Sequence, residues 1–245
     1  MNRNIQLVII LLILLTSCAR SRPEAKDQEY RLNDNGDTIN IYHKKDGTLL
    51  SEVTTKNGRL NGFSWDYYPN GKVKKMITYK DDIKQGLSEW YYDDGQLFQQ
   101  TPYLNDKIHG VRKKYHKDGW LMAEIPYENG EPIPGTSEYT SSGELINDYP
   151  EILFFTSDDR ATKGIYTIRM YLSNKKREVF FYYYKDINGK KTKIGMPTKY
   201  NGIADFNIKI HPGQPLPEQV EVFAQFETTR KNPYVTSGVY YHEEE

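Results

Sequence analysis

The stretch that decides the fold is Gly62 to Gln85, GFSWDYYPNGKVKKMITYKDDIKQ, because the pattern recurs along the chain. GLSEWYYDDGQLFQQTPYLNDKIH follows from Gly86, and GVRKKYHKDGWLMAEIPYENGEPIP follows from Gly110. A fourth, degenerate copy begins GTSEYTSSGELINDY at Gly135. Self-similarity at a fixed period indicates a repeat architecture. One glycine of each turn keeps a spacing of 24 residues throughout, at Gly47, Gly71, Gly95, Gly119 and Gly143.

Each unit predicts two short strands joined by a tight turn. The turns carry PNG, DDG or KDG, and Asn or Asp before Gly favours the positive φ angles of two-residue hairpin turns. Because strand side chains alternate between faces, residues at matching positions form columns across successive hairpins. The columns before the turn begin with Phe63 and Tyr67, and those after it with Val73, Ile77 and Tyr79. We expect an antiparallel meander over residues 30–149, with YKDDIKQG, YLNDKIHG and YENGEPIPG as polar linking loops.

The 24-residue period ends at Pro150, and residues 150–245 have a different, non-repetitive sequence pattern. The predicted strands are EILFF, GIYTIRMYLS, REVFFYYY, IADFNIKI, QVEVFAQFETT and YVTSGVYY, with a weaker one in KTKIGMPTKY. Six or seven short strands with turn signals between them are typical of a small immunoglobulin-like β-sandwich. The predicted fold is therefore all-β, a repetitive hairpin meander followed by a sandwich.

The first 17 residues have the layout of a secretory signal. Arg3 precedes an apolar run, IQLVIILLILL, that is shorter than the roughly 20 residues a membrane-spanning helix needs. The run ends in LTSC, which resembles the lipobox of bacterial lipoproteins and places the cysteine at Cys18. That resemblance implies cleavage before Cys18 and acylation of its sulfur and amino group. A soluble secreted protein with a chance cysteine, or an uncleaved anchor helix, are the alternatives. Residues 18–29 are polar and charged, and we expect them to form a tether between lipid and fold.

The composition agrees with an exported, lipid-anchored protein. With Cys18 acylated, the mature chain has no thiol for a disulfide, a cysteine nucleophile or a cysteine-based zinc site. Lys and Arg total 33, as do Asp and Glu, so no excess of positive charge points to nucleic acid as a partner. Ala19 stands where lipoproteins retained at an inner membrane usually carry Asp. The resemblance therefore implies that the destination within the cell envelope is the outer membrane of a two-membrane bacterium.

The repeat itself resembles a known family, the bacterial variant of the MORN repeat. The shared features are a glycine, an aromatic pair, a turn glycine and a tyrosine at similar spacing, over roughly Gly47 to Tyr149. Bacterial proteins with such repeats are often labelled YwqK-like antitoxin components. That label implies an antitoxin or immunity-like role, although an exported lipoprotein is badly placed to neutralise a cytoplasmic toxin.

Catalytic and metal-binding patterns are missing from the sequence. The histidines form no His-Glu-x-x-His pair, and neither a Gly-x-Ser-x-Gly elbow nor a phosphate-binding loop occurs. Acidic pairs could indicate a carboxylate dyad or a calcium site, but the EF-hand spacing is absent and Asp is common in turns. We therefore expect a protein that is not an enzyme and holds neither metal nor cofactor. The acidic pairs are Asp81 with Asp82, Asp93 with Asp94, and Asp158 with Asp159.

Aromatic residues crowded near the repeat turns are the candidate binding residues. Exposed rings can stack on sugars or act as protein hot spots, whereas rings in strands often serve only to cover a sheet. The sequence predicts an envelope scaffold whose repeat surface binds an envelope protein or a polysaccharide, with the antitoxin role and a hydrolase of unfamiliar type as alternatives. The candidate residues are Trp65, Tyr67, Tyr68, Trp90, Tyr91 and Tyr92.

Overall fold

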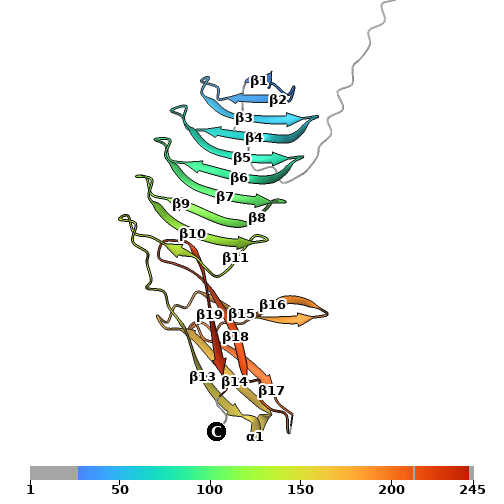
Figure 1. Ribbon diagram of the computed structural model, residues 1–245, viewed down its shortest axis with the longest axis vertical. Helices are drawn as coiled ribbons and strands as arrows, with labels where there is room; N and C mark the ends of the chain where they lie inside the picture. Colours follow the sequence, from blue (N-terminus) through green and yellow to red (C-terminus); the bar gives the residue numbers. More distant parts are fainter. Residues whose placement is uncertain (1–26, 212, 243–245) are drawn as a thin grey trace, which may run out of the picture.

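The computed structural model describes residues 27–211 and 213–242, which form strands, turns and one short helix (Figure 1). Cys18 and the predicted signal segment lie outside these residues. The first twelve strands form one antiparallel sheet in chain order from β1 to β11, in which β8 pairs with β7 and β12 with β10. This confirms the predicted meander. The strands are β1 (Asp27–Leu32), β2 (Thr38–His43), β3 (Leu49–Lys56), β4 (Arg59–Tyr67), β5 (Val73–Lys80), β6 (Ile83–Tyr91), β7 (Leu97–Leu104), β8 (Lys107–Ile108), β9 (Gly110–Tyr115), β10 (Leu121–Glu128), β11 (Glu131–Pro132) and β12 (Ser137–Glu138).

The sheet begins earlier than the predicted tether allows. Asp27 to Glu29, expected to be tether, belong to β1, which pairs with β2 from Asp27 opposite His43 to Leu32 opposite Thr38. A charged segment can form a strand here because β2 supplies its ladder partner and charges are common on edge strands. At the other end, the degenerate fourth unit is reduced to β12 and an isolated bridge between Tyr139 and Leu145.

The repeat contains two kinds of turn, and their positions differ from the prediction. At Gly71 the glycine N–H donates to the Tyr68 carbonyl (2.9 Å) and the Tyr68 N–H donates to the Lys72 carbonyl (2.8 Å). This is a three-residue loop, a type I turn closed by a left-handed glycine, and it recurs at Gly95 and Gly119. Two-residue turns occur instead within the predicted polar loops, where both central residues have positive φ and the strands continue on either side. They are Asp81–Asp82, Asn105–Asp106 and Asn129–Gly130.

The first glycine of each unit lies opposite a tyrosine on the neighbouring strand. Gly62 pairs with Tyr79, Gly86 with Tyr103, and Gly110 with Tyr127. Their φ angles of 96°, 91° and 106° are ones that a residue with a side chain rarely adopts. Aromatic side chains cover cross-strand glycines in sheets, which accounts for the recurrence of Gly and Tyr at these two positions.

The C-terminal strands form two sheets around one core. The predicted strands are all present, including the weaker one, and one turn of helix that was not predicted, α1 (Arg160–Lys163), follows the first of them. The sheets have the orders β13-β14-β17 and β16-β15-β18-β19. If the seven strands from β13 to β19 are lettered A, B, C, C′, E, F and G in chain order, the two sheets are A-B-E and C′-C-F-G. This is the arrangement of immunoglobulin-like sandwiches. The strands are β13 (Ile152–Asp159), β14 (Ile165–Leu172), β15 (Val179–Ile187), β16 (Lys190–Met196), β17 (Ala204–Lys209), β18 (Gln219–Glu227) and β19 (Pro233–Tyr241).

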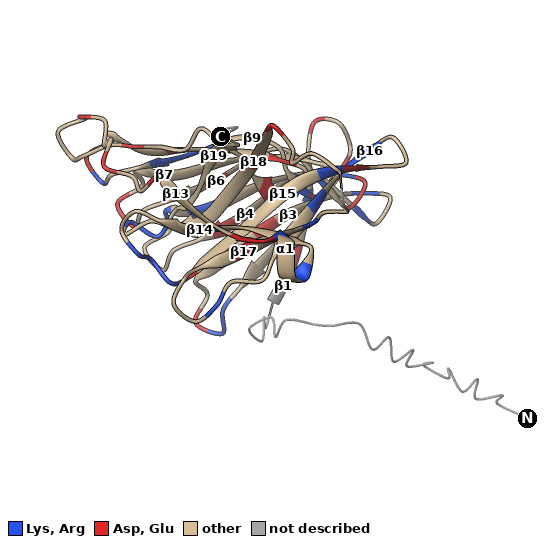
Figure 2. Ribbon diagram, turned by 90° about the horizontal axis from the view of Figure 1, so that it is seen from below, with Lys and Arg blue, Asp and Glu red and all other residues tan. Residues whose placement is uncertain are grey.

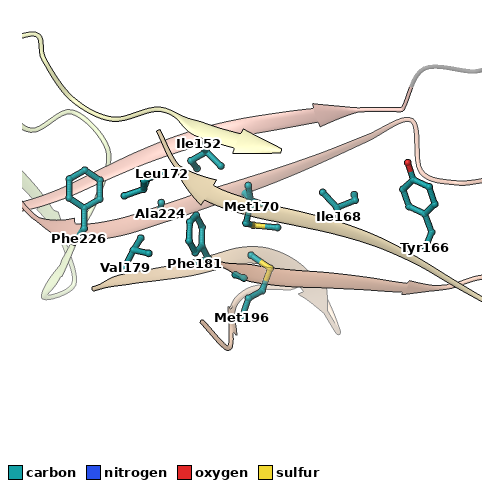
Figure 3. Packing of buried hydrophobic residues seen from close by; sticks show 12 residues of the cluster. Ile152, Tyr166, Ile168, Met170, Leu172, Val179, Phe181, Met196, Ala224 and Phe226 are labelled. Atoms are coloured by element: carbon teal, nitrogen blue, oxygen red, sulfur yellow. The ribbon is translucent and has the colours of Figure 1, made fainter. Parts of the chain in front are cut away.

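Side chains from both sheets fill the sandwich core (Figure 3). Ile168, Met170 and Leu172 of β14 face Phe181 of β15 and Ala224 of β18, and all are buried. The alternation of apolar residues along these strands places every second side chain in the core. Without a disulfide, this apolar packing is the principal source of stability for the sandwich.

A buried polar cluster joins the repeat sheet to the sandwich. Glu138 of β12 is 1% exposed, and its carboxylate accepts hydrogen bonds from Thr228 Oγ1 (2.7 Å), Asn232 Nδ2 (2.5 Å) and Tyr149 OH (3.0 Å). Lys114 of β9 donates from Nζ to Asn232 Oδ1 (2.5 Å), and burial lowers the pKa of this lysine. We call Glu138, Tyr149, Thr228 and Asn232 the junction cluster. The 149/150 boundary predicted between the two parts falls in the link that precedes β13.

Charged residues of both signs are interspersed over the molecule (Figure 2). They occur at hairpin ends of the repeat sheet and on the sandwich strands, in keeping with equal totals of basic and acidic residues. Among residues 27–211 and 213–242, no helix has the length and apolar character needed to cross a membrane.

Candidate interaction surface

The repeat sheet is a single layer with two distinct faces, which the strand register identifies. One row runs from Trp65 to Met76, Glu89, Gln100 and Lys113, each the direct cross-strand partner of the last. Cross-strand partners point to the same side of a sheet. Phe63 and its repeat equivalents each lie two residues before a member of this row, so their side chains point to the same side of the sheet. We call this side the Phe63 face.

The opposite side, the Trp90 face, carries the row from Asp66 to Lys75, Trp90, Gln99 and Lys114. Trp65 and Trp90 therefore lie on different faces, although both were predicted within one surface. The reason lies in the repeat: Trp65 is equivalent to Glu89, while Trp90 is equivalent to Asp66.

An exposed apolar column crosses the Phe63 face. Phe63, Leu87 and Val111 occupy the same position in three units and are 48%, 46% and 44% exposed. Neighbouring strands lie about 4.8 Å apart, so residues two strands away are separated by about 10 Å. The sequence identified this column but not its exposure, because its apolar character suggested burial. The sheet is a single layer here, and no second layer formed by the described residues covers the column.

Polar residues beside the column form a hydrogen-bonded network on the same face. Tyr91 OH donates to Glu89 Oε2 (2.5 Å), Gln100 Nε2 donates to Glu89 Oε1 (2.8 Å), and Tyr115 OH donates to Gln100 Oε1 (3.3 Å). Burial, together with the Glu89 carboxylate, raises the pKa of Tyr91 to about 12. Trp65 lies 5.8 Å from Phe63, measured between ring centroids, and is half-buried. The network holds the side chains around the column in fixed positions.

Two of the predicted binding tyrosines link neighbouring units. Tyr68 OH donates to the carbonyl of Tyr91 (2.7 Å), and Tyr92 OH donates to the carbonyl of Tyr115 (2.9 Å). Each phenol thus ties one three-residue loop to the next unit, 23 residues further on. In the third unit His116 takes this place, and its Nε2 is buried with no hydrogen-bond partner in the described part of the chain. Tyr67 is half-buried, and its pKa is raised by burial.

The Trp90 face is less exposed than the Phe63 face, because several of its side chains are buried and one end of it contacts the sandwich. Ser88 and Thr101 are buried in its middle, and Trp90 is 43% exposed with Lys75 Nζ 5.7 Å from its ring centroid. Near the sandwich, Ala123 and Ile125 are fully buried on the same side as the Lys114 contact with the sandwich. The Phe63 face is thus the one that presents a regular apolar column to solvent.

The acidic pairs make structural contacts. Asp82 Oδ1 accepts the backbone N–H of Leu60 (2.7 Å), a bond that lowers the pKa of Asp82, and Asp94 Oδ1 accepts that of Gln96 (3.0 Å) with the same effect. In the third pair, Arg160 bonds Asp158 at 2.7 Å and lowers its pKa to about 2. Within residues 27–211 and 213–242, no group of three or more side chains is placed to hold a metal ion.

Comparison with known families bears on the repeat part alone. Residues 66–81, 84–105 and 108–129 match the MORN repeat variant, and the second and third matches are offset by 24 residues. The resemblance is therefore confirmed over residues 66–129, within the wider range of Gly47 to Tyr149. MORN repeats are generally modules that interact with proteins or membranes. A search of curated proteins found no match to this chain. The lipoprotein signal and the YwqK-like label stay predictions.

Proposed function

We propose that this protein is a non-enzymatic interaction protein of the cell envelope, held there by lipid on Cys18, whose repeat sheet binds a protein through the Phe63 face. The observation that carries the proposal is the exposed column of Phe63, Leu87 and Val111. Apolar side chains exposed together on one face of a monomeric protein are typical of protein-binding surfaces. The match to a repeat used for interactions supports the same reading.

The spacing of the column suggests the kind of partner. Apolar groups about 10 Å apart match every seventh residue of an α-helix, which rises about 1.5 Å per residue. The flanking Glu89, Gln100 and Lys113 offer polar contacts at the rim. We therefore propose an amphipathic helix of another envelope protein as the partner, lying across the strands.

Site-specific photocrosslinking in the native host tests the surface. A crosslinker at position 63 or 87 is expected to capture one protein through a helical segment, whereas a crosslinker at position 90, equally exposed on the other face, is expected not to. Leu87→Ser should reduce binding of the captured protein at least about tenfold, as loss of an interface hot spot does. Equal capture from both faces, self-crosslinking, or unchanged binding by Leu87→Ser would contradict the proposal.

Metabolic labelling with a tagged fatty acid tests the anchor. The wild type should incorporate the label, fractionate with the outer membrane and lose both properties in Cys18→Ala. Absence of label from the wild type would overturn the anchor and favour the antitoxin-like alternative, in which the protein acts in the cytoplasm.

A further inference from the structure

The second candidate site lies on the sandwich, on the outward face of its four-stranded sheet. Along β15, Phe181 points into the core, so its neighbours Phe180 and Tyr182 point outward. Tyr182 and Phe223 are 2% and 9% exposed, and their rings stack with centroids 5.2 Å apart. Phe180 stacks on Tyr182 at 5.8 Å and stays 46% exposed. The sheet thus carries a packed aromatic layer from which two rings stay accessible, Phe180 and, at 37% exposed, Tyr184.

The position of the Phe180 ring depends on a glycine in the adjacent strand. A Cβ at Gly195 would lie 2.8 Å from Cζ of Phe180, closer than real contacts allow. Lys193, two residues away, places Nζ 4.2 Å from the centroid of Tyr182 and 5.4 Å from that of Phe180. Backbone on one side and a lysine stem alongside therefore hold the ring against the sheet.

A hollow of about 390 Å³ lies beside this ring, between the sandwich and the end of the repeat sheet. Its volume is in the lower part of the range of small-molecule sites, which often lie where two parts of a chain meet. The repeat sheet contributes Glu131, which accepts a hydrogen bond from Lys193 Nζ (3.2 Å), and Gln225 Oε1 accepts another from the same nitrogen (3.3 Å). The lining residues are Glu131, Phe180, Lys193, Gln225, Phe226, Glu227 and Pro233.

The chemistry of the lining selects a class of ligand. The charge of Lys193 is paired with Glu131, which disfavours a phosphate or another anion. The carboxylates of Glu131 and Glu227 and the amide of Gln225 line the hollow together with Phe180, and these polar groups disfavour a wholly apolar ligand. A flat C–H face bordered by hydroxyl groups satisfies both conditions, because aromatic rings attract C–H groups and carboxylates accept hydroxyl protons.

We propose that this hollow binds a neutral saccharide, with one pyranose ring stacked on Phe180 and its hydroxyl groups bonded to Glu131, Lys193 and Gln225. The site uses residues from both parts of the chain, so it requires the two to be joined as the junction cluster joins them. It is separate from the Phe63 face and does not depend on the function proposed for that face.

Titration of the full chain with cellotriose, maltotriose and triacetylchitotriose, followed by NMR, tests the site. We expect at least one probe to bind with a Kd of about 5 mM or tighter and to shift resonances of Phe180 and Lys193. Phe180→Ala should weaken binding at least about tenfold, the usual effect of losing a stacking ring. Gly195→Ala should weaken it as well, because the added methyl group displaces the ring.

Phe155→Ala is the matched control. Phe155 is 39% exposed on the other sheet and also has a cation near its ring, with Arg169 5.7 Å from the centroid. Its loss should leave saccharide binding unchanged, as should Leu87→Ser on the repeat sheet. No binding of any probe at about 5 mM, or equal weakening by Phe155→Ala, would overturn the proposal. If Gly195→Ala alters the circular dichroism spectrum, that variant is not correctly folded, and the effect of Phe180→Ala on saccharide binding then decides the test.

Discussion

Replacing Glu138 with alanine tests how firmly the repeat sheet and the sandwich are coupled. The side chain is 1% exposed, and the substitution leaves three donors without an acceptor: Thr228 Oγ1, Asn232 Nδ2 and Tyr149 OH. Each buried donor left unsatisfied costs about 1–3 kcal/mol, so three of them would together cost about 3–9 kcal/mol. The two hydroxyl groups can rotate toward other acceptors, so we expect a loss of about 3–5 kcal/mol, in the lower part of that range.

Urea unfolding with two probes measures this loss. Trp65 and Trp90 lie in strands of the repeat sheet and Trp120 in the loop between β9 and β10, so tryptophan fluorescence reports on the repeat part alone. Far-ultraviolet circular dichroism reports on both parts. With an m-value of about 2 kcal/mol per molar urea, the midpoint should fall by about 2 M. The two probes should unfold together in the wild type and separately in Glu138→Ala, because the variant uncouples the two parts.

Two control variants distinguish the loss of the junction cluster's hydrogen bonds from the general effect of removing an acidic side chain. Glu138→Gln keeps the volume and one acceptor oxygen and should lose only about 1–3 kcal/mol. Glu144→Ala, at an exposed position nearby, should change stability by less than about 0.5 kcal/mol. If Glu138→Ala unfolds at the same urea concentration as Glu144→Ala, the junction cluster does not couple the two parts.

Three further predictions concern the repeat and the sandwich. Tyr68→Phe removes the phenol bond to the Tyr91 carbonyl and should lower the free energy of unfolding, followed by fluorescence, by about 0.5–1.5 kcal/mol. Gly110→Ala should lower it by about 1–3 kcal/mol, because its φ of 106° strains any residue with a side chain. Because Arg160 lowers the pKa of Asp158 to about 2, this carboxylate should contribute stability above pH 3.8 that is lost as the pH falls through 2. NMR titration should find that pKa in the wild type and a higher pKa in Arg160→Gln, which keeps only the backbone hydrogen bond from residue 160.

Each of these has an outcome that contradicts it. If Tyr68→Phe is as stable as the wild type, the hydrogen bond from the Tyr68 phenol to the Tyr91 carbonyl does not contribute to the free energy of unfolding. Stabilisation by Gly110→Ala, the usual result where φ is negative, would show that the glycine is not held at positive φ. An Asp158 pKa unaffected by Arg160→Gln would separate that carboxylate from its neighbour.

The turns of the repeat differ most from what the sequence predicted. The 24-residue period correctly placed a chain reversal at every repeat glycine, but the Asn-Gly and Asp-Gly pairs predicted two-residue turns there. The structure instead has three-residue loops at Gly71 and its equivalents, and two-residue turns at Asp81–Asp82 and its equivalents. Both sites contain residues that tolerate positive φ, so composition alone could not separate them. Ladder register across the neighbouring strands decided between them.

For the candidate surface, too, the sequence predicted some features and only the structure showed others. The columns of Phe63, Leu87 and Val111 were readable from spacing, yet their exposure was not, since alternation identifies a face without saying what covers it. The sequence also did not show that the hydroxyl groups of Tyr68 and Tyr92 reach the backbone of the next unit, and their binding role stays a prediction.

By itself, the sequence determined the repeat period, the all-β class and the strands of the sandwich, because these follow from local alternation and from turn residues at fixed spacing. Only the tertiary structure decided which face of the sheet stays open, that Glu138 is buried against Thr228 and Asn232 some 90 residues away, and that Phe180 borders a hollow with Glu131. Those contacts join residues far apart in the chain. Their burial depends on how whole sheets pack against one another, which no local pattern encodes.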